Sequence, residues 1–261
     1  LLAESLPFFF KVSLKEFLFT TEWTPLFENA KYGILPLLSG TLTTSLIALV
    51  IAIPLGTIIA TYLSEFANDR WREILKPVLE LLAAVPTVVY GYFAFLFVTP
   101  LLEKIFPQIS GFNVLSAGLV MGVMIIPYVS SLSEDSMRSV SKSLREGSMA
   151  LGASKFETAF KVVYPSAFSG ITSAYILGIS RAFGETMVVA IAAGMQPQIS
   201  YNPLEPAATI TAYIVQVSLG DLPHGSIGYQ TIYVAGLTLL IITLIFNMLG
   251  FWIKNRYQEK E

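Results

Sequence analysis

The segment from Tyr32 to Ser64 has the sequence YGILPLLSGTLTTSLIALVIAIPLGTIIATYLS and carries no charged residue. A helix crosses the hydrocarbon core of a bilayer with about 20 apolar residues, so this segment is long enough to span it with some tilt. Of the 261 residues of the whole chain, 54% are hydrophobic and 13% are charged, whereas about 25% of the residues of a soluble domain are charged. The sequence therefore predicts an all-α, polytopic membrane protein.

Five segments are predicted to cross the membrane completely. They are Leu35 to Tyr62, about Val78 to Val98, about Val114 to Ser133, about Phe168 to Gly194 and about Tyr229 to Ile253. Because Pro86 lies inside the second segment and cannot donate a helical hydrogen bond, a kink is expected there. No stretch is left over for a soluble domain, so residues 1–261 are predicted to form a single transmembrane domain.

The Lys and Arg residues between the spans indicate the orientation, because cytoplasmic loops carry an excess of positive charge. Eleven follow the first, third and fifth spans, whereas four lie on the opposite side. This asymmetry places the C-terminus in the cytoplasm and, with five spans, residue 1 outside. The chain starts Leu1-Leu2-Ala3, without an initiator Met or a signal peptide, so a sixth span is expected upstream.

The composition excludes most catalytic and metal sites. The chain has no Cys and a single His, His224, in a predicted outer loop, which leaves no thiolate site and no His-based zinc or protease site. No Walker A sequence for nucleotide binding occurs, and a net charge of −2 offers no basic surface for nucleic acid. We therefore expect no enzyme activity, no metal and no cofactor. A role in transport remains possible, because transport requires none of these.

The segment from about residue 134 to 167, between the third and fourth spans, is predicted to be a structured cytoplasmic loop. Apolar residues recur in it at helical spacing: Met137, Val140 and Leu144, then Phe156, Phe160 and Val163. Ser154 and Glu157 have the spacing of a capping box, which predicts two short helices joined by a turn at Gly152. The pair either projects as a knob that docks into a partner's groove or lies on the membrane surface.

Two charged residues interrupt the fourth span. A charged side chain at the centre of a spanning helix costs about 2.5–3.5 kcal/mol on insertion scales, so it requires a protein or aqueous environment. Arg181 and Glu185 are spaced i, i+4, which places them on one face of a continuous helix. The guanidinium of Arg181 can hold two oxygens of an oxyanion. The residues alone fit a substrate path as well as a structural ion pair between helices.

The cytoplasmic segment resembles the EAA loop of ABC-importer permeases. That motif has a Glu, a Gly six residues later and, after about nine more residues, an apolar residue, a variable one and a Pro. Its Glu, Gly and Pro match Glu146, Gly152 and Pro165. Its two alanines are replaced by Gly147 and Ser148, both small residues. The resemblance implies that Glu146, Gly147, Ala150 and Gly152 couple the membrane domain to an ATPase.

A wider resemblance, from about Trp23 to Gly250, is to the PstC-type permease subunit of the bacterial phosphate ABC importer. The matching stretches are Trp23-Thr24-Pro25, Pro36 to Thr41, Pro54-Leu55-Gly56, Tyr62 to Glu65, Val85 to Gly91 and the RAFGETM sequence from Arg181 to Met187. The last of these also occurs in related form in the sister PstA subunit, so the choice of PstC rests on the N-terminal matches.

This resemblance implies a type I ABC-importer permease-like helical bundle in the prokaryotic cytoplasmic (inner) membrane, surrounded by lipid. It implies import of inorganic phosphate by alternating access, with a PstA-like sister permease, two ATPase subunits and an extracytoplasmic phosphate-binding protein as partners. It favours Arg181 and Glu185 as residues of the substrate path. A permease for another oxyanion and an ion-coupled secondary transporter are the alternatives, although a secondary carrier has no use for an ATPase-docking loop.

Overall fold

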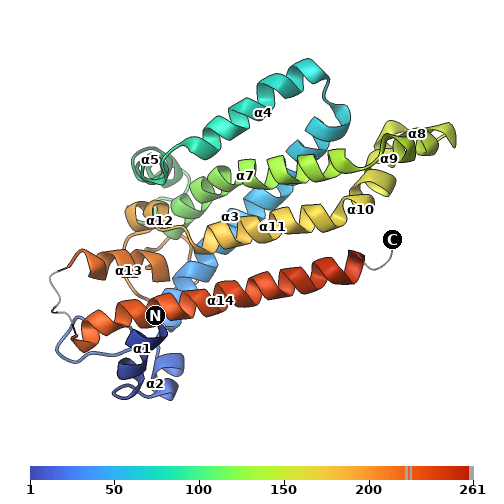
Figure 1. Ribbon diagram of the computed structural model, residues 1–261. Helices are drawn as coiled ribbons and strands as arrows, with labels where there is room; N and C mark the ends of the chain where they lie inside the picture. Colours follow the sequence, from blue (N-terminus) through green and yellow to red (C-terminus); the bar gives the residue numbers. More distant parts are fainter. Residues whose placement is uncertain (221–222, 224, 259–261) are drawn as a thin grey trace. The chain divides into compact units, whose positions relative to one another are not determined.

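The computed structural model describes residues 1–220, 223 and 225–258, so His224 and Lys260 lie outside the described residues. The described chain is almost entirely helical (Figure 1). Its helices are α1 (Leu2–Phe9), α2 (Leu14–Phe19), α3 (Leu35–Thr61), α4 (Asp69–Ala84), α5 (Thr87–Phe93), α6 (Thr99–Glu103), α7 (Val114–Ser139), α8 (Lys142–Ala150), α9 (Lys155–Thr158), α10 (Tyr164–Ser166), α11 (Phe168–Phe183), α12 (Met187–Ala192), α13 (Ile210–Ser218) and α14 (Ile227–Gln258), with π-helical turns η1 (Tyr62–Phe66), η2 (Ala94–Val98) and η3 (Ala159–Val163).

Among the residues that the structure describes, three helices are individually long and apolar enough to cross a membrane. They span Leu35–Phe66, Val114–Ser139 and Ile227–Ile253, which confirms the first, third and fifth predicted spans. The third continues six residues past its predicted end at Ser133, so Glu134 belongs to α7 and not to a loop. The number of candidate spans rises to five if each of two bent helix pairs is counted as one span.

The second predicted span is broken and not merely kinked. Helix α4 ends at Ala84 and α5 starts at Thr87, while Val85 has an extended backbone. The residue before a proline is disfavoured in the helical region, and Pro86 has no N–H to continue the helix. Helix α4 starts as early as Asp69, so the basic residues predicted to form a loop are helical.

The fourth predicted span is also interrupted, and its prediction as one helix to Gly194 is wrong. Helix α11 ends at Phe183 and α12 begins at Met187. Glu185 therefore lies beyond the end of α11, so the predicted shared helical face with Arg181 does not form. Before α11, the segment Lys155–Ser166 is bent by 72° from it, and we treat that segment as lying outside the membrane span.

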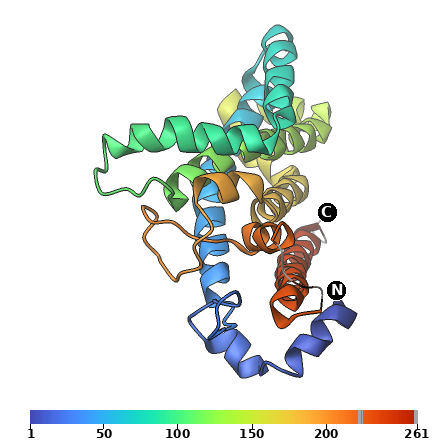
Figure 2. The same ribbon diagram turned by 90° about the vertical axis from the view of Figure 1, so that its left-hand side faces the viewer.

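The chain divides into two compact units, each described separately below. The first comprises Leu1–Ala48, Pro86–Met121 and Ala182–Leu244. Its core joins the N-terminal helices to α13 through T-shaped pairs of aromatic rings: the ring centres of Phe8 and Phe17 lie 6.0 Å apart, and those of Trp23 and Tyr213 lie 5.1 Å apart. In the same unit, α5, η2 and α6 continue as one rod with α12 beside it (Figure 2).

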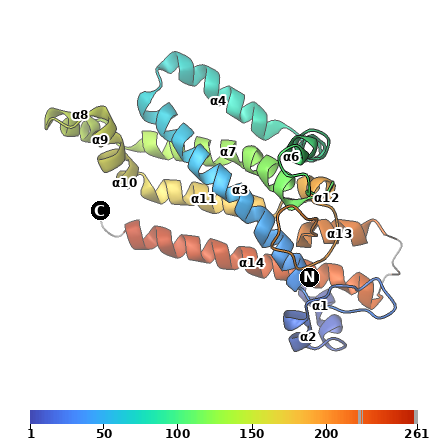
Figure 3. The same ribbon diagram turned by 180° about the vertical axis from the view of Figure 1, so that it is seen from behind.

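The second unit comprises Leu49–Val85, Gly122–Arg181 and Ile245–Glu261. Its α7 and α11 approach closely at glycines, since a Cβ added to Gly170 would lie 2.3 Å from the Ser136 hydroxyl oxygen. The buried side chains of Met137, Val163 and Ile171 form a core where α7 meets the loop. Helices α8 and α9 project from this end of α7 (Figure 3).

Candidate functional site

The predicted cytoplasmic loop forms a helical hairpin. Helices α8 and α9 are joined by a turn in which Gly152 has a φ of +91°, a conformation that residues with a side chain rarely adopt. The prediction of two short helices around Gly152 is confirmed. The prediction that Met137, Val140 and Leu144 share one helical face is wrong. Met137 is buried in α7, and α8 does not start until Lys142.

The predicted capping box starts α9. The hydroxyl oxygen of Ser154 accepts a hydrogen bond from the Glu157 backbone N–H at 3.2 Å, and the Glu157 carboxylate accepts one from the Ser154 N–H at 3.0 Å. The backbone and side-chain hydrogen bonds of Ser154, followed by Lys161, lower the pKa of Glu157 to about 2. A carboxyl group whose pKa is lower in the folded than in the unfolded protein stabilises the fold at pH values above its unfolded pKa of about 4.3. This stabilisation is lost as the pH falls toward the folded pKa, so the cap is intact at neutral pH.

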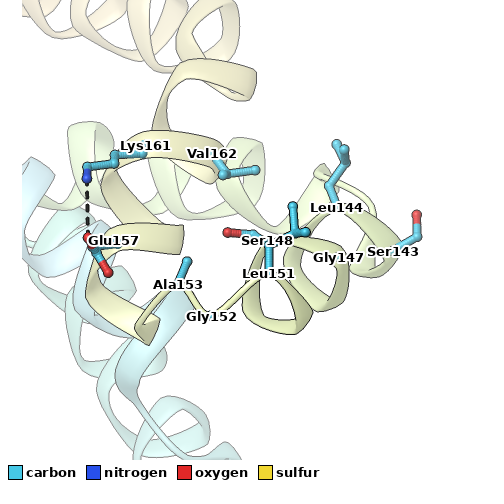
Figure 4. A pocket seen from close by; sticks show the side chains of 10 residues that line it. All are labelled: Ser143, Leu144, Gly147, Ser148, Leu151, Gly152, Ala153, Glu157, Lys161 and Val162. Carbon is cyan, nitrogen blue, oxygen red and sulfur yellow. Dashed lines mark hydrogen bonds and ion pairs between the residues drawn. The ribbon is translucent and has the colours of Figure 1, made fainter.

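The hairpin exposes several large apolar side chains. Leu151 is 91% exposed, and Leu144, Phe156 and Phe160 are also exposed. A cavity of about 670 Å³ lies between α8 and the α9–η3 segment, with Gly147, Leu151 and Gly152 in its lining (Figure 4). A Cβ added to either glycine would meet nothing within 4 Å. Of the four predicted coupling residues, Gly147 and Gly152 line this cavity, while Glu146 and Ala150 are exposed on α8.

Within the second unit, Arg145 ties the hairpin to η1 and to the end of α7. Its Nη2 and Nε donate to the two carboxylate oxygens of Glu65 at 2.9 and 3.1 Å, and Nη2 also donates to the Met137 carbonyl at 2.7 Å. Both side chains are mostly buried, and two parallel hydrogen bonds fix the orientation of the guanidinium. This pair was not predicted, although Arg145 directly precedes the motif residue Glu146.

A buried carboxylate on α7 holds α4. The Glu134 side chain is 1% exposed, and its carboxylate lies 2.6 Å from Lys76 Nζ and 3.6 Å from both Arg72 Nε and Arg138 Nη1. Lys76 also contacts the more exposed Asp135 at 2.6 Å. Since α4 has no buried residue among those described, these ion pairs are its main polar attachment to α7. The sequence analysis used these cations only to assign orientation.

Replacing Glu134 by Gln is expected to lower the stability of the protein by about 2 kcal/mol. The change leaves three cations beside a buried neutral amide. Removing one partner of a buried ion pair costs about 3–5 kcal/mol. We expect a smaller cost here because the three cations are partly exposed. Thermal unfolding in detergent measures the loss. The matched change Asp135→Asn removes an exposed pair and should cost less than about 1 kcal/mol; equal losses from both changes would contradict the role of Glu134.

Arg181 lies in the last turn of α11 and is partly buried. Its guanidinium carbon lies 5.6 Å from the centre of the Tyr128 ring on α7. A guanidinium can stack on an aromatic face and still direct its N–H groups along its own plane. This arrangement orients the guanidinium of Arg181.

Glu185 is buried, with 4% of its surface exposed. One oxygen of its carboxylate accepts hydrogen bonds from the backbone N–H groups of Met187 at 3.1 Å and Val188 at 3.2 Å. Its backbone carbonyl accepts a 2.7 Å hydrogen bond from the Thr211 hydroxyl. The Glu185 carboxylate therefore caps the start of α12, and the sequence analysis did not foresee this role.

A helical membrane chain with a protruding hairpin between two spans is the form expected of an importer permease. Residues 52–260 match the family described as the inner membrane component of binding-protein-dependent transport systems. The chain belongs to this family. It is thus a membrane component of a binding-protein-dependent transport system.

Curated relatives match over nearly the whole chain. A protein of Bacillus subtilis described as a probable ABC transporter permease protein, YqgH, is 36% identical over 94% of this chain and 79% of its own length. The phosphate transport system permease protein PstC of Xylella fastidiosa (strain 9a5c) is 33% identical over 94% of this chain and 80% of its own length.

Solved structures of low identity share the fold. A bacterial ABC transporter for the import of alginate is 15% identical, with a TM-score of 0.69 over 98% of this chain and 88% of that one. An inward-facing MetNI methionine transporter is 17% identical, with a TM-score of 0.63 over 86% of this chain and 94% of that one. The predicted type I importer-permease fold is confirmed.

Proposed function

We propose that the chain is the PstC-type transmembrane subunit of an ATP-driven importer that carries inorganic phosphate across the cytoplasmic membrane by alternating access. The relatives named as phosphate permeases support the choice of substrate, because they match this chain over almost its full length at about a third identity. Residues 1–261 then act as one permease domain, with the loop of residues 134–167 as its coupling segment.

The observation that carries this function is the exposed hairpin. It exposes large apolar side chains beside a cavity of about 670 Å³. It is held to η1 by the Arg145–Glu65 pair and to α7 by the hydrogen bond from Arg145 to the Met137 carbonyl. Exposed apolar surface of this kind marks an interaction site. Because the chain has no nucleotide-binding motif of its own, ATP hydrolysis is assigned to a pair of partner ATPase subunits, one of which docks here through the surface of Glu146, Gly147, Ala150 and Gly152.

The remaining partners follow from the same assignment. A PstA-like sister permease completes the membrane dimer, and an extracytoplasmic phosphate-binding protein delivers the substrate. The hairpin and the C-terminus then face the cytoplasm, in agreement with the excess of Lys and Arg on that side.

We assign the substrate path to Arg181 and Glu185. The positively charged guanidinium of Arg181 can donate two parallel hydrogen bonds to the phosphate oxygens. Its position over Tyr128 supports this role, because the ring orients the guanidinium. Phosphate at neutral pH retains P–OH groups that sulfate lacks, so an ionised Glu185 can accept a hydrogen bond from phosphate and repels sulfate. A site built around such a bond rejects an analogue without the proton by ~10⁴ in favourable cases.

Reconstitution of the chain with its sister permease, ATPase and binding protein tests the proposal. Proteoliposomes with ATP on the ATPase side should accumulate radioactive phosphate, and excess sulfate should not compete. Vesicles lacking the ATPase serve as the control. Uptake driven by an ion gradient without the ATPase would instead establish a secondary transporter, and equal competition by sulfate would establish a permease for another oxyanion.

A further inference from the structure

A second cavity lies beside the hairpin, in the second unit. It has a volume of about 350 Å³ and is bounded by η1, the start of α4, the end of α7 and the hairpin. Five cationic residues line it: Arg72, Arg138, Lys142, Arg145 and Lys155. Its volume is at the lower end of the range of small-molecule sites, which is about 300–1,000 Å³.

The cations of this cavity outnumber the carboxylates that neutralise them. Only Glu65 and Asp69 line it with negative charge, and Glu134 adds a third carboxylate through its contacts with Arg72 and Arg138. Five positive charges therefore face three negative ones. An excess of one sign in a cavity with low-dielectric walls concentrates ions of the opposite sign.

Two of the cations carry this excess. Among the residues that the structure describes, no carboxylate lies within 4.0 Å of the ammonium group of Lys142 or of Lys155. The Lys155 ammonium lies 5.6 Å from the centre of the Phe66 ring, a cation–π contact that orients it, and its charge also acts on the Glu65 carboxylate. Lys142 and Lys155 come from the first turns of α8 and α9, so both arms of the hairpin contribute to one cavity.

We propose that this cavity binds a phosphate group, supplied by free inorganic phosphate or by the headgroup of an anionic lipid. The two lysines and Arg138 provide charged donors to a tetrahedral anion with several acceptor oxygens. Arg181 does not line this cavity, so the site is separate from the substrate path. Because Arg145 lines it and binds Glu65, a bound anion competes with the contact that anchors the hairpin.

The test uses the assembled importer without its binding protein. Equilibrium dialysis in uncharged detergent measures the affinity for radioactive inorganic phosphate, and native mass spectrometry measures phosphatidylglycerol retained from mixed-lipid nanodiscs. In Lys142→Gln/Lys155→Gln, the affinity for one of these two ligands should fall about tenfold or more. Arg70→Gln is the control, because Arg70 is an exposed cation on α4 outside the cavity, and it should change affinity less than about twofold. Elution of each variant as an intact complex verifies folding.

The two measurements distinguish the sources of the phosphate group. Lysine-dependent binding of inorganic phosphate, retained in Arg181→Gln, identifies a free-ion site distinct from the substrate path. Lysine-dependent retention of phosphatidylglycerol alone identifies a lipid headgroup site. The proposal is overturned if the double variant retains both ligands with wild-type affinity, or if Arg70→Gln weakens binding to the same degree.

Discussion

Replacing Arg181 by Gln should reduce phosphate uptake by about a hundredfold or more while the protein still inserts and assembles. The change removes the charge that compensates for the lost hydration of the anion in a low-dielectric path. Two hydrogen bonds to a charged group contribute about 3 kcal/mol together, which corresponds to a factor of about a hundred. Uptake into proteoliposomes, normalised to the amount of assembled complex, measures the effect.

Companion variants separate transport from structure. Arg181→Lys keeps the charge but loses the planar fork, so it should retain part of the activity. Tyr128→Leu removes the ring under the guanidinium and should lower uptake less than Arg181→Gln does. If Arg181→Gln instead prevents assembly, or lowers the melting temperature as much as uptake, Arg181 is a structural residue that holds α11 to α7.

Glu185→Gln tests the second assigned path residue in the same assay. The amide oxygen can still accept the hydrogen bonds from Met187 and Val188, so the start of α12 is retained. In a permease altered to work without its binding protein, sulfate should then compete better with phosphate. Unchanged discrimination would leave Glu185 with the capping role alone.

The membrane spans were predictable because each depends on a long local run of apolar residues. The hairpin was predictable for a similar reason, since Gly152 and the Ser154–Glu157 capping box lie close together in the sequence. The break at Pro86 was foreseen only as a kink. A single proline indicates where helical hydrogen bonding fails, but not whether the chain resumes its direction.

The interruption after Phe183 was not predictable from the local sequence. Residues 168–194 are apolar enough for one span, and the break is stabilised by a residue 26 positions away, because the Thr211 hydroxyl donates to the Glu185 carbonyl. The charge cluster around Glu134 was missed for the same reason. Lys76 precedes Glu134 by 58 residues. The number of charged residues in each loop indicates the side of the membrane on which they lie, but not which residues they contact.

A charge at the tip of the hairpin should abolish ATP-driven transport. In Leu151→Asp, little folding energy is lost, because the native side chain is 91% exposed and its backbone has a negative φ. The new carboxylate would have to be desolvated in an apolar interface with the ATPase, which costs several kcal/mol without a partner charge. We expect loss of ATPase co-purification and uptake below about a hundredth of the wild-type rate.

Two further variants show whether docking or the turn is responsible. Gly152→Asp has open space for its side chain, but the φ of +91° strains any residue with a Cβ, so it should also uncouple transport by distorting the turn. Leu219→Asp is the matched control, because Leu219 is 82% exposed at the end of α13, in the other unit. It should leave uptake within about twofold of wild type. Normal ATPase binding and uptake by Leu151→Asp would show that the hairpin's apolar tip is not the docking surface, since the substitution places a charge where such a partner would have to contact it.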